Sequence, residues 1–235
     1  MTLNLGSNMA SWIDVEFAGH DLVLDAELAL YWPAVDALVV SDLHLEKSTF
    51  LAQFGSAIAP LDSHDTLQRL AALVARYRPK SLILLGDSFH DRGAWDRLDP
   101  TSQRQLLDIC ASVDNCCFVE GNHDRDLALP ECLCFEDERT IANIVFRHEP
   151  EATSAPQVVG HFHPALSLSL RGHRLRGKCF AVNESLLIMP AFGSYTGGLS
   201  LRDPVFAALA GGAPFRPYLV YKNTVAAVRF SLDER

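Results

Sequence analysis

The sequence predicts an α/β fold, a four-layer α-β-β-α sandwich of two facing mixed sheets flanked by helices. Three observations carry this prediction. Apolar runs alternate with amphipathic helical stretches up to about residue 140, strand-like runs without helices follow, and no linker-like segment divides the sequence. Alternating strands and helices favour a largely parallel sheet, and a later strand-rich region favours a second, more antiparallel sheet. We therefore expect residues 1–235 to form a single domain.

The first half of the sequence predicts a hairpin and then three buried strands. Residues 12–17 and 20–24 alternate in polarity around Ala18 and Gly19, a pattern typical of a β-hairpin at a sheet edge. Residues 37–41, 81–85 and 116–120 are short apolar runs, and each leads directly into a polar cluster. We expect these three runs to be neighbouring buried strands that feed three polar loops.

Two helices are expected between these strands. Residues 63–77 carry Leu67, Leu70 and Val74 at helical spacing and stop before Pro79, and residues 100–112 show a similar pattern. After about residue 140 we expect no further helix. Strands are predicted there over residues 141–148, 157–160, 178–183, 186–190, 216–221 and 224–232.

Composition and charge restrict the class of protein. Of the 235 residues 49% are hydrophobic and 21% charged, and no run of apolar residues is long enough to span a bilayer. The N-terminus does not resemble a secretory signal, so a cytoplasmic protein without a membrane partner is expected. The net charge of −9 would repel a polyanion, so any nucleic-acid contact must be local. Residues 171–178 form a basic cluster that could supply such a contact or could be a solvated hairpin.

Metal-binding side chains follow the ends of five predicted strands. Seven of them are candidate ligands: Asp42, His44, Asp87, Asn122, His148, His161 and His163. Residues two apart in a strand point to the same side, so Asp42 with His44, and His161 with His163, should enter one cavity. Seven donors are too many for one four-coordinate ion and suit two divalent ions. Nitrogen and oxygen donors without a thiolate favour Mn, Fe or Zn over Ca and do not choose among the three. We expect Mn²⁺, with Fe or Zn as alternatives.

The order of these residues resembles the motifs of the calcineurin-like metallophosphoesterases. The matching strings are Asp42-x-His44, Gly86-Asp87-x-x-x-Asp91, Gly121-Asn122-His123-Asp124, His148 and Gly160-His161-x-His163. The resemblance implies that one metal is held by Asp42, His44, Asp87 and His163, and the other by Asp87, Asn122, His148 and His161. It also implies that His123 protonates the leaving oxygen while Asp124 orients the His123 ring.

One motif departs from the family pattern. The carboxylate after Gly86-Asp87 comes one residue later than usual, at Asp91, which puts its usual supporting role in doubt. His90 lies within this wider spacing, and a similar histidine occurs in the double-strand-break-repair nucleases of the superfamily. His90 is therefore a candidate phosphate contact, with a supporting or surface role as the alternative.

Strings outside the metal motifs resemble a narrower group. Residues 41–47, 147–150 and 190–198 are similar to the DNA-ligase-associated, PdeM-type metallophosphoesterases of the DNA-damage response. This resemblance implies a phosphodiesterase, and within that class a nuclease acting on DNA, with a DNA ligase and other repair proteins as functional partners. The implied reaction is attack on phosphorus by a hydroxide that bridges the two metals. A phosphoesterase for small diesters or monoesters, and a non-catalytic scaffold, are the alternatives.

Overall fold

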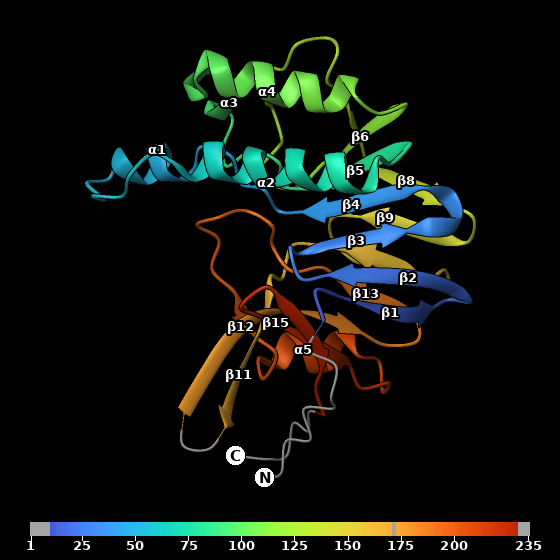
Figure 1. The fold of residues 1–235 in the computed structure, drawn as a ribbon. Helices are drawn as coiled ribbons and strands as arrows, with labels where there is room; N and C mark the ends of the chain where they lie inside the picture. The colour runs from blue at the N-terminus through green and yellow to red at the C-terminus, as the bar shows by residue number, and fades with distance from the viewer. Residues whose placement is uncertain (1–9, 171–172, 230–235) are drawn as a thin grey trace.

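The computed structural model describes residues 10–170 and 173–229, which form two mixed sheets and a small number of helices. Figure 1 shows the longest helices, α2 and α4, in the upper part of the molecule, beside β5 and β6 and above β1 to β4. This arrangement confirms the predicted mixed α/β fold of two sheets. Within the described residues, none of the helices is long and apolar enough to cross a membrane.

The first sheet has seven strands in their sequence order, β1 to β7. Neighbouring strands from β1 through β4 pair antiparallel, and neighbouring strands from β4 through β7 pair in parallel. The strands are β1 (Trp12–Phe17), β2 (His20–Asp25), β3 (Ala29–Trp32), β4 (Ala37–Ser41), β5 (Ser81–Leu85), β6 (Asn115–Val119) and β7 (Phe135–Glu136). The hairpin predicted at Ala18 and Gly19 is confirmed, because both residues have positive φ, as a tight two-residue hairpin turn requires.

Two amphipathic helices cover the outer face of the first sheet. They are α2 (Asp62–Tyr77) and α4 (Pro100–Ala111), and each differs from its predicted range by one residue at one end. Asp99 caps α4 by accepting hydrogen bonds from the backbone N–H groups of Thr101 and Ser102 at 2.9 and 3.1 Å. The buried leucines of both helices pack on Val40, Leu84 and Phe118 of the sheet. The shorter helices in this half are η1 (Pro33–Val35), α1 (Lys47–Ala52) and α3 (Ala94–Arg97).

The second sheet has nine strands and mixed pairing. Seven strands run in the order β14-β11-β12-β13-β10-β9-β8, and β15 and β16 extend from β12. β10 pairs in parallel with β9 and β13, whereas β12 pairs antiparallel with β11, β13 and β15. The strands are β8 (Glu138–Ile141), β9 (Ile144–Arg147), β10 (Gln157–Val159), β11 (Pro164–Leu170), β12 (His173–Val182), β13 (Leu186–Ile188), β14 (Leu199–Ser200), β15 (Arg216–Tyr221) and β16 (Thr224–Ala227).

The expectation that helices stop near residue 140 is wrong. The six-residue helix α5 (Pro204–Leu209) follows Asp203, which caps it by accepting a hydrogen bond from Val205 N. Phe206 of α5 is buried against Leu166, Leu201 and Leu219, so this helix covers part of the outer face of the second sheet. A helix of six residues is less than two turns long, so it has too few apolar residues at helical spacing to be recognised from sequence.

The inner faces of the two sheets share one apolar core. Phe17, Leu24 and Trp32 from the first sheet are buried in the same cluster as Phe146 and Phe180 from the second. The rings of Trp32 and Phe146 lie 6.4 Å apart between centroids. This shared core holds the two sheets face to face and fixes where their strand ends meet.

Candidate metal centre

The carboxyl ends of five strands bring the predicted ligands to one edge of the sandwich. The strands β4, β5 and β6 are neighbours in the first sheet, and β9 and β10 are neighbours in the second. Parallel strands end at the same edge, so the loops that follow them converge. These loops carry Asp42 and His44 after β4, Asp87 after β5, Asn122 after β6, His148 after β9, and His161 and His163 after β10.

Most of these residues have an unusual backbone conformation. Asp42, His44, Asp87, His161 and His163 all have φ between 45° and 67°, in the left-handed region. For residues other than glycine this conformation costs roughly 1–2 kcal/mol each. The expectation that Asp42 with His44, and His161 with His163, lie within strands is wrong, because β4 ends at Ser41 and β10 at Val159. The left-handed turns aim the side chains instead, and such strain is concentrated at functional sites.

One group of potential ligands consists of Asp42, His44 and His163. The Nε2 atom of His163 lies 3.0 Å from Oδ1 of Asp42 and 3.3 Å from Nε2 of His44. The donor atoms of all three residues lie within 4.8 Å of one another, close enough to hold one ion. Asp42 is fully buried and is held by the backbone N–H of His161, 3.2 Å from each carboxylate oxygen.

A second group consists of Asp87, His148 and His161, with Asn122 beside it. Nε2 of His148 lies 3.4 Å from Oδ2 of Asp87 and 3.1 Å from Nδ1 of His161. The side-chain oxygen of Asn122 lies 3.1 Å from His148 Nε2 and 3.2 Å from His161 Nδ1. Donors that lie far apart along the chain therefore converge on one point.

Asp87 lies between the two groups. Its Oδ2 atom is 3.8 Å from Nε2 of His44 in the first group and 3.4 Å from Nε2 of His148 in the second. Its other oxygen accepts a hydrogen bond of 2.9 Å from the backbone N–H of His123. Burial raises the pKa of Asp87, but the interactions with His148, His123 and His44 outweigh burial and leave the pKa below its usual value. The carboxylate is therefore ionised and available to cations.

At three positions beside the centre only glycine fits, because a side chain there would overlap atoms of the site. A Cβ at Gly86 would lie 2.0 Å from Nδ1 of His148, and one at Gly121 would lie 2.2 Å from Oδ1 of Asp87. A Cβ at Gly160 would lie 2.0 Å from the hydroxyl oxygen of Ser41, which itself lies 2.5 Å from Oδ2 of Asp42. Each glycine directly precedes a predicted ligand, so the tight packing of the site explains the Gly-Asp, Gly-Asn and Gly-His strings.

The protonation state of His44 suits metal binding. Burial lowers the pKa of His44 to about 3, so its imidazole is neutral at pH 7 and has a free nitrogen lone pair. The Nδ1 atom of His148 is buried and has no hydrogen-bond partner within residues 10–170 and 173–229. For His148, burial lowers the pKa, but the hydrogen bond to Asp87 and the charges of Asp42, Asp87 and Asp124 outweigh burial and raise it. Imidazole nitrogens beside ionised carboxylates are a donor set for divalent transition-metal ions.

Comparison with known families agrees with this geometry. Residues 36–180 match the sequence profile of the calcineurin-like phosphoesterases. The chain belongs to the calcineurin-like phosphoesterase family. This membership makes the protein a metal-dependent phosphoesterase, and it implies divalent metal ions for which the two ligand groups are suited. Among curated proteins, none matches the chain significantly.

A solved structure resembles this phosphoesterase over nearly its full length. It is the crystal structure of Pseudomonas putida nuclease MPE, which is 32% identical and superimposes with a TM-score of 0.71. The match covers 92% of this chain and 99% of the other. The likeness therefore extends beyond the five metal motifs to both sheets.

The phosphoesterase positions His123 differently from the sequence expectation. Nδ1 of His123 lies 2.7 Å from the carbonyl oxygen of His90, which can accept its proton. The carboxylate of Asp124 instead accepts the backbone N–H groups of Phe89, Gly121 and Ser88 at 2.9–3.2 Å. Asp124 thus links the loops that follow β5 and β6. The carbonyl of His90, and not the carboxylate of Asp124, contacts the His123 ring at Nδ1. Burial and the charge of Asp87 raise the pKa of Asp124 to about 7, although the three N–H groups act in the opposite direction.

His90 lies against the metal centre. Its ring stacks on that of His123, with centroids 5.0 Å apart and an interplanar angle of 17°. Its Nδ1 atom lies 3.4 Å from Nδ1 of His44, and the three histidines form a third close group of donors. Burial lowers the pKa of His90 to about 4, with the nearby charge of Lys47 acting in the same direction. The placement is consistent with a substrate contact, which stays a prediction.

Asp91 and the basic cluster lie outside the ligand groups. Asp91 forms an ion pair with Arg97 and caps the turn at Gly93. Arg176 donates to the carbonyl of Gly198 at 2.8 Å, and Arg174 is exposed. Arg171 falls outside the described residues, and His173 lies at the start of β12. Arg176 is thus bound to the loop at Gly198, and the phosphate-contact role of the basic cluster stays a prediction.

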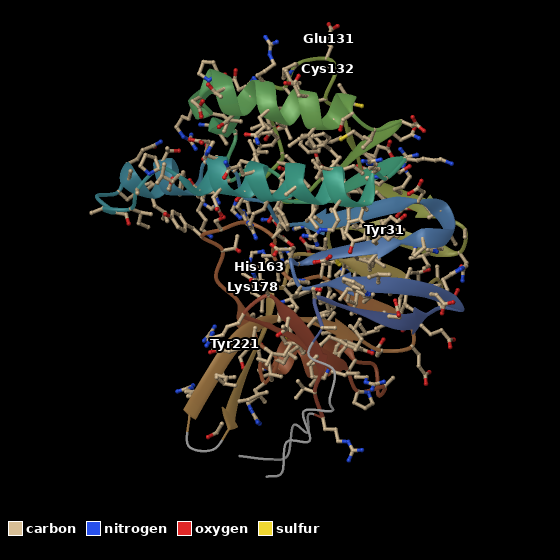
Figure 2. The ribbon with its side chains drawn as sticks, in the orientation of Figure 1. Tyr31, Glu131, Cys132, His163, Lys178 and Tyr221 are labelled. Atoms are coloured by element: carbon tan, nitrogen blue, oxygen red, sulfur yellow. The ribbon has the colours of Figure 1, made fainter. Side chains whose placement is uncertain are left out.

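Lys178 supports a loop beside the centre, a role that the sequence did not suggest. Its ammonium donates to the carbonyls of Ala191 and Gly193 and to the hydroxyl of Thr196 at 2.7–3.0 Å. The loop in turn donates from Gly193 N to the carbonyl of Asp42 at 3.1 Å. Figure 2 shows Lys178 near His163, in the region between α2 and the β11–β12 hairpin. The only sequence signal was a lysine preceding the apolar run of β12.

Proposed function

We propose that this phosphoesterase is a two-metal phosphodiesterase, a nuclease that cleaves DNA in a repair context. The observation that carries the proposal is the position of Asp87 between two ligand groups. A carboxylate shared by two groups is the arrangement that a dinuclear site needs. The structural similarity to a nuclease supports the choice of a diester in nucleic acid as substrate.

We assign the ligands as the family resemblance implies. Asp42, His44, Asp87 and His163 would hold one ion, and Asp87, Asn122, His148 and His161 the other, with Mn²⁺ as the preferred metal. When bound, two such cations lower the pKa of a coordinated water and neutralise charge on the phosphate oxygens. Three donors of each set support this division, because Asp42, His44 and His163 form one close group and Asp87, His148 and His161 another. Asp87 also lies 3.8 Å from His44, and Asn122 lies 3.2 Å from His161.

His123 is the proposed general acid. Its Nδ1 proton is held by the His90 carbonyl, which leaves Nε2 as the atom that would deliver a proton to the departing sugar oxygen. Asp124 is a positioning residue in this scheme, because it fixes the loop that carries His123. His90, which stacks on the His123 ring, would contact a phosphate oxygen of the substrate.

The wider context is also a proposal. The PdeM-like strings support a place in the DNA-damage response, with a DNA ligase and other repair proteins as functional partners in the cytoplasm. We further propose that residues 1–235 act as a single metallophosphoesterase domain. The apolar core shared by both sheets supports this view.

A metal-reconstitution experiment tests the function. The purified protein is stripped with a chelator, reloaded with Mn²⁺, Zn²⁺ or Mg²⁺, and given bis-p-nitrophenyl phosphate, p-nitrophenyl phosphate and single-stranded or nicked DNA. The proposal expects Mn²⁺-dependent cleavage of the diester and of DNA. Cleavage of the monoester alone would instead support a small-molecule phosphatase, and the absence of any Mn²⁺-dependent diester cleavage would exclude the proposal.

A further inference from the structure

A strip of one cation and two aromatic rings leads away from the metal centre along α1. Lys47, Phe50 and Phe54 are spaced i, i+3 and i+7, so they share one face of α1 and the turn that follows it. The exposed fraction of Phe54 is 74%, the largest of any exposed large hydrophobic residue in the described part of the chain. Figure 1 shows α1 extending beyond the end of α2, away from the body of the sandwich.

The rings of this strip are in contact with the rings of the centre. The Phe50 ring meets the His90 ring edge to face, with centroids 4.9 Å apart, and His90 stacks on His123. In the outward direction, Phe50 contacts Phe54 at 5.2 Å between centroids. A continuous series of rings therefore runs from His123, beside the predicted metals, to a phenyl group in solvent.

Lys47 adds positive charge at the inner end of the strip. The backbone N–H of Lys47 donates to the carbonyl of His44 at 3.2 Å, which places this residue beside the centre. Asp62 and Asp87 attract the ammonium, yet within the described part of the chain no carboxylate lies within ion-pair distance of it. A half-buried cation without an ion-pair partner is suited to a phosphate group of a ligand.

We propose that Lys47, Phe50 and Phe54 form a strip that binds unpaired nucleotides next to the phosphate held at the metal centre. Lys47 would contact a flanking backbone phosphate, and the phenyl rings would stack on bases, which expose their faces only in single strands. The inference rests on the proposed nuclease function and adds a specific binding surface to it. A small phosphomonoester would not reach Phe54, so the strip favours a polynucleotide.

A second copy of the chain is the other occupant that the exposed rings could accept. Ile58 and Leu61, which follow Phe54, are also exposed. Another molecule seated on Phe50 and Phe54 would, however, cover the ring series that leads to His123. The contact with the centre therefore favours a substrate strand over a dimer partner.

The test compares a polynucleotide with a small diester on the same variants. Phe54→Ala removes the exposed ring, Phe54→Trp restores a stacking surface, and Trp12→Ala is the control. Trp12 is 54% exposed but lies on β1, the edge strand of the first sheet. We expect Phe54→Ala to lower kcat/KM for single-stranded DNA about tenfold relative to kcat/KM for bis-p-nitrophenyl phosphate. Phe54→Trp should return this ratio to the wild-type value, and Trp12→Ala should leave it unchanged.

Other outcomes overturn the inference without touching the nuclease proposal. An unchanged ratio in Phe54→Ala, or a ratio that Trp does not restore, would remove the stacking role. A wild-type dimer that becomes a monomer in Phe54→Ala, measured by light scattering, would assign the rings to self-association instead.

Binding can also be measured without turnover. Anisotropy of a fluorescent single-stranded oligonucleotide gives the affinity at several salt concentrations, and Lys47→Gln should reduce the slope of log K against log salt by about 0.7. If the wild type cleaves no diester but Phe54→Ala still weakens oligonucleotide binding, the strip stands and the nuclease function fails. If neither variant changes binding, the strip is excluded.

Discussion

The side chain of His148 occupies the space that a side chain on Gly86 would need. A Cβ at residue 86 would lie 2.0 Å from Nδ1 and 2.7 Å from Cβ of His148. Gly86 follows β5 of the first sheet and directly precedes Asp87, whereas His148 follows β9 of the second sheet. The close approach of these two residues therefore holds one loop from each sheet against the other at the metal centre.

Substitution of Gly86 should remove bound metal as well as lower the stability of the fold. Gly86→Ala adds a steric clash to the strain of φ +74°, and we expect loss of bound metal and of diesterase activity. Gly19→Ala is the matched control, because Gly19 has φ +81° but no atom lies within 4 Å of the position that an added methyl group would take. The control should lose about 1–2 kcal/mol of stability and keep its metal. Metal analysis and thermal unfolding of both variants check this, and equal metal content would contradict it.

Substitution of Asp87 should weaken metal binding at both positions, and substitution of His161 at only one. Asp87→Asn removes a charge close to both His44 and His148, so we expect less than one bound ion per chain. His161→Ala should retain about one ion, because the Asp42, His44 and His163 group remains intact. Metal stoichiometry by mass spectrometry distinguishes these variants. Asp91→Asn, which loses only its partner Arg97, should bind as much metal as the wild type.

His123 should affect turnover without affecting metal content. Replacing its imidazole by an amide in His123→Asn removes the proton donor, so we expect kcat for a diester with a poor leaving group to fall by about 10²–10⁴. A p-nitrophenyl leaving group needs little protonation, and its hydrolysis should slow less. Equal rate losses on both leaving groups, or loss of metal, would argue against His123 as the acid.

Lys178 should make stability depend on pH. Burial lowers the pKa of Lys178 to about 7, whereas an unfolded lysine titrates near 10.4. Between these values the unfolded chain binds more protons than the folded chain, so the contribution of Lys178 to stability rises with pH from about 7 to about 10. Denaturant unfolding of the metal-free protein and of Lys178→Met should therefore show a steeper rise with pH in the wild type. Parallel curves would mean that the hydrogen bonds to the loop keep the folded lysine charged.

The sequence determined the local elements and the identity of the chemistry. Strong periodicity placed α2 and α4 correctly, and the apolar runs placed β4 and β5 at their observed bounds. The ordered motifs indicated the family that the sequence profile then matched. Such signals are local, because hydrophobic spacing and the side chains that bind metal can be read without knowing the partners of a residue.

Several features needed the tertiary structure. The pairs Asp42 with His44 and His161 with His163 are presented by left-handed turns and not by strands. Gly160 packs against Ser41 and Asp42, and Gly193 against Leu43, so closely that neither position has room for a Cβ. The His90 carbonyl, and not Asp124, faces Nδ1 of His123. Backbone contacts of this kind have no residue signature, since any amino acid supplies a carbonyl.

Which histidines meet which carboxylates was decided only when the two sheets packed. Asp87 comes from the first sheet and His148 from the second, and the shared core that includes Trp32 and Phe146 holds these sheets face to face. The amino-acid order specified a set of donors, and burial of apolar area fixed their positions. Packing a large core yields one arrangement of the strand ends, and that arrangement cannot be derived from the spacing of residues along the chain.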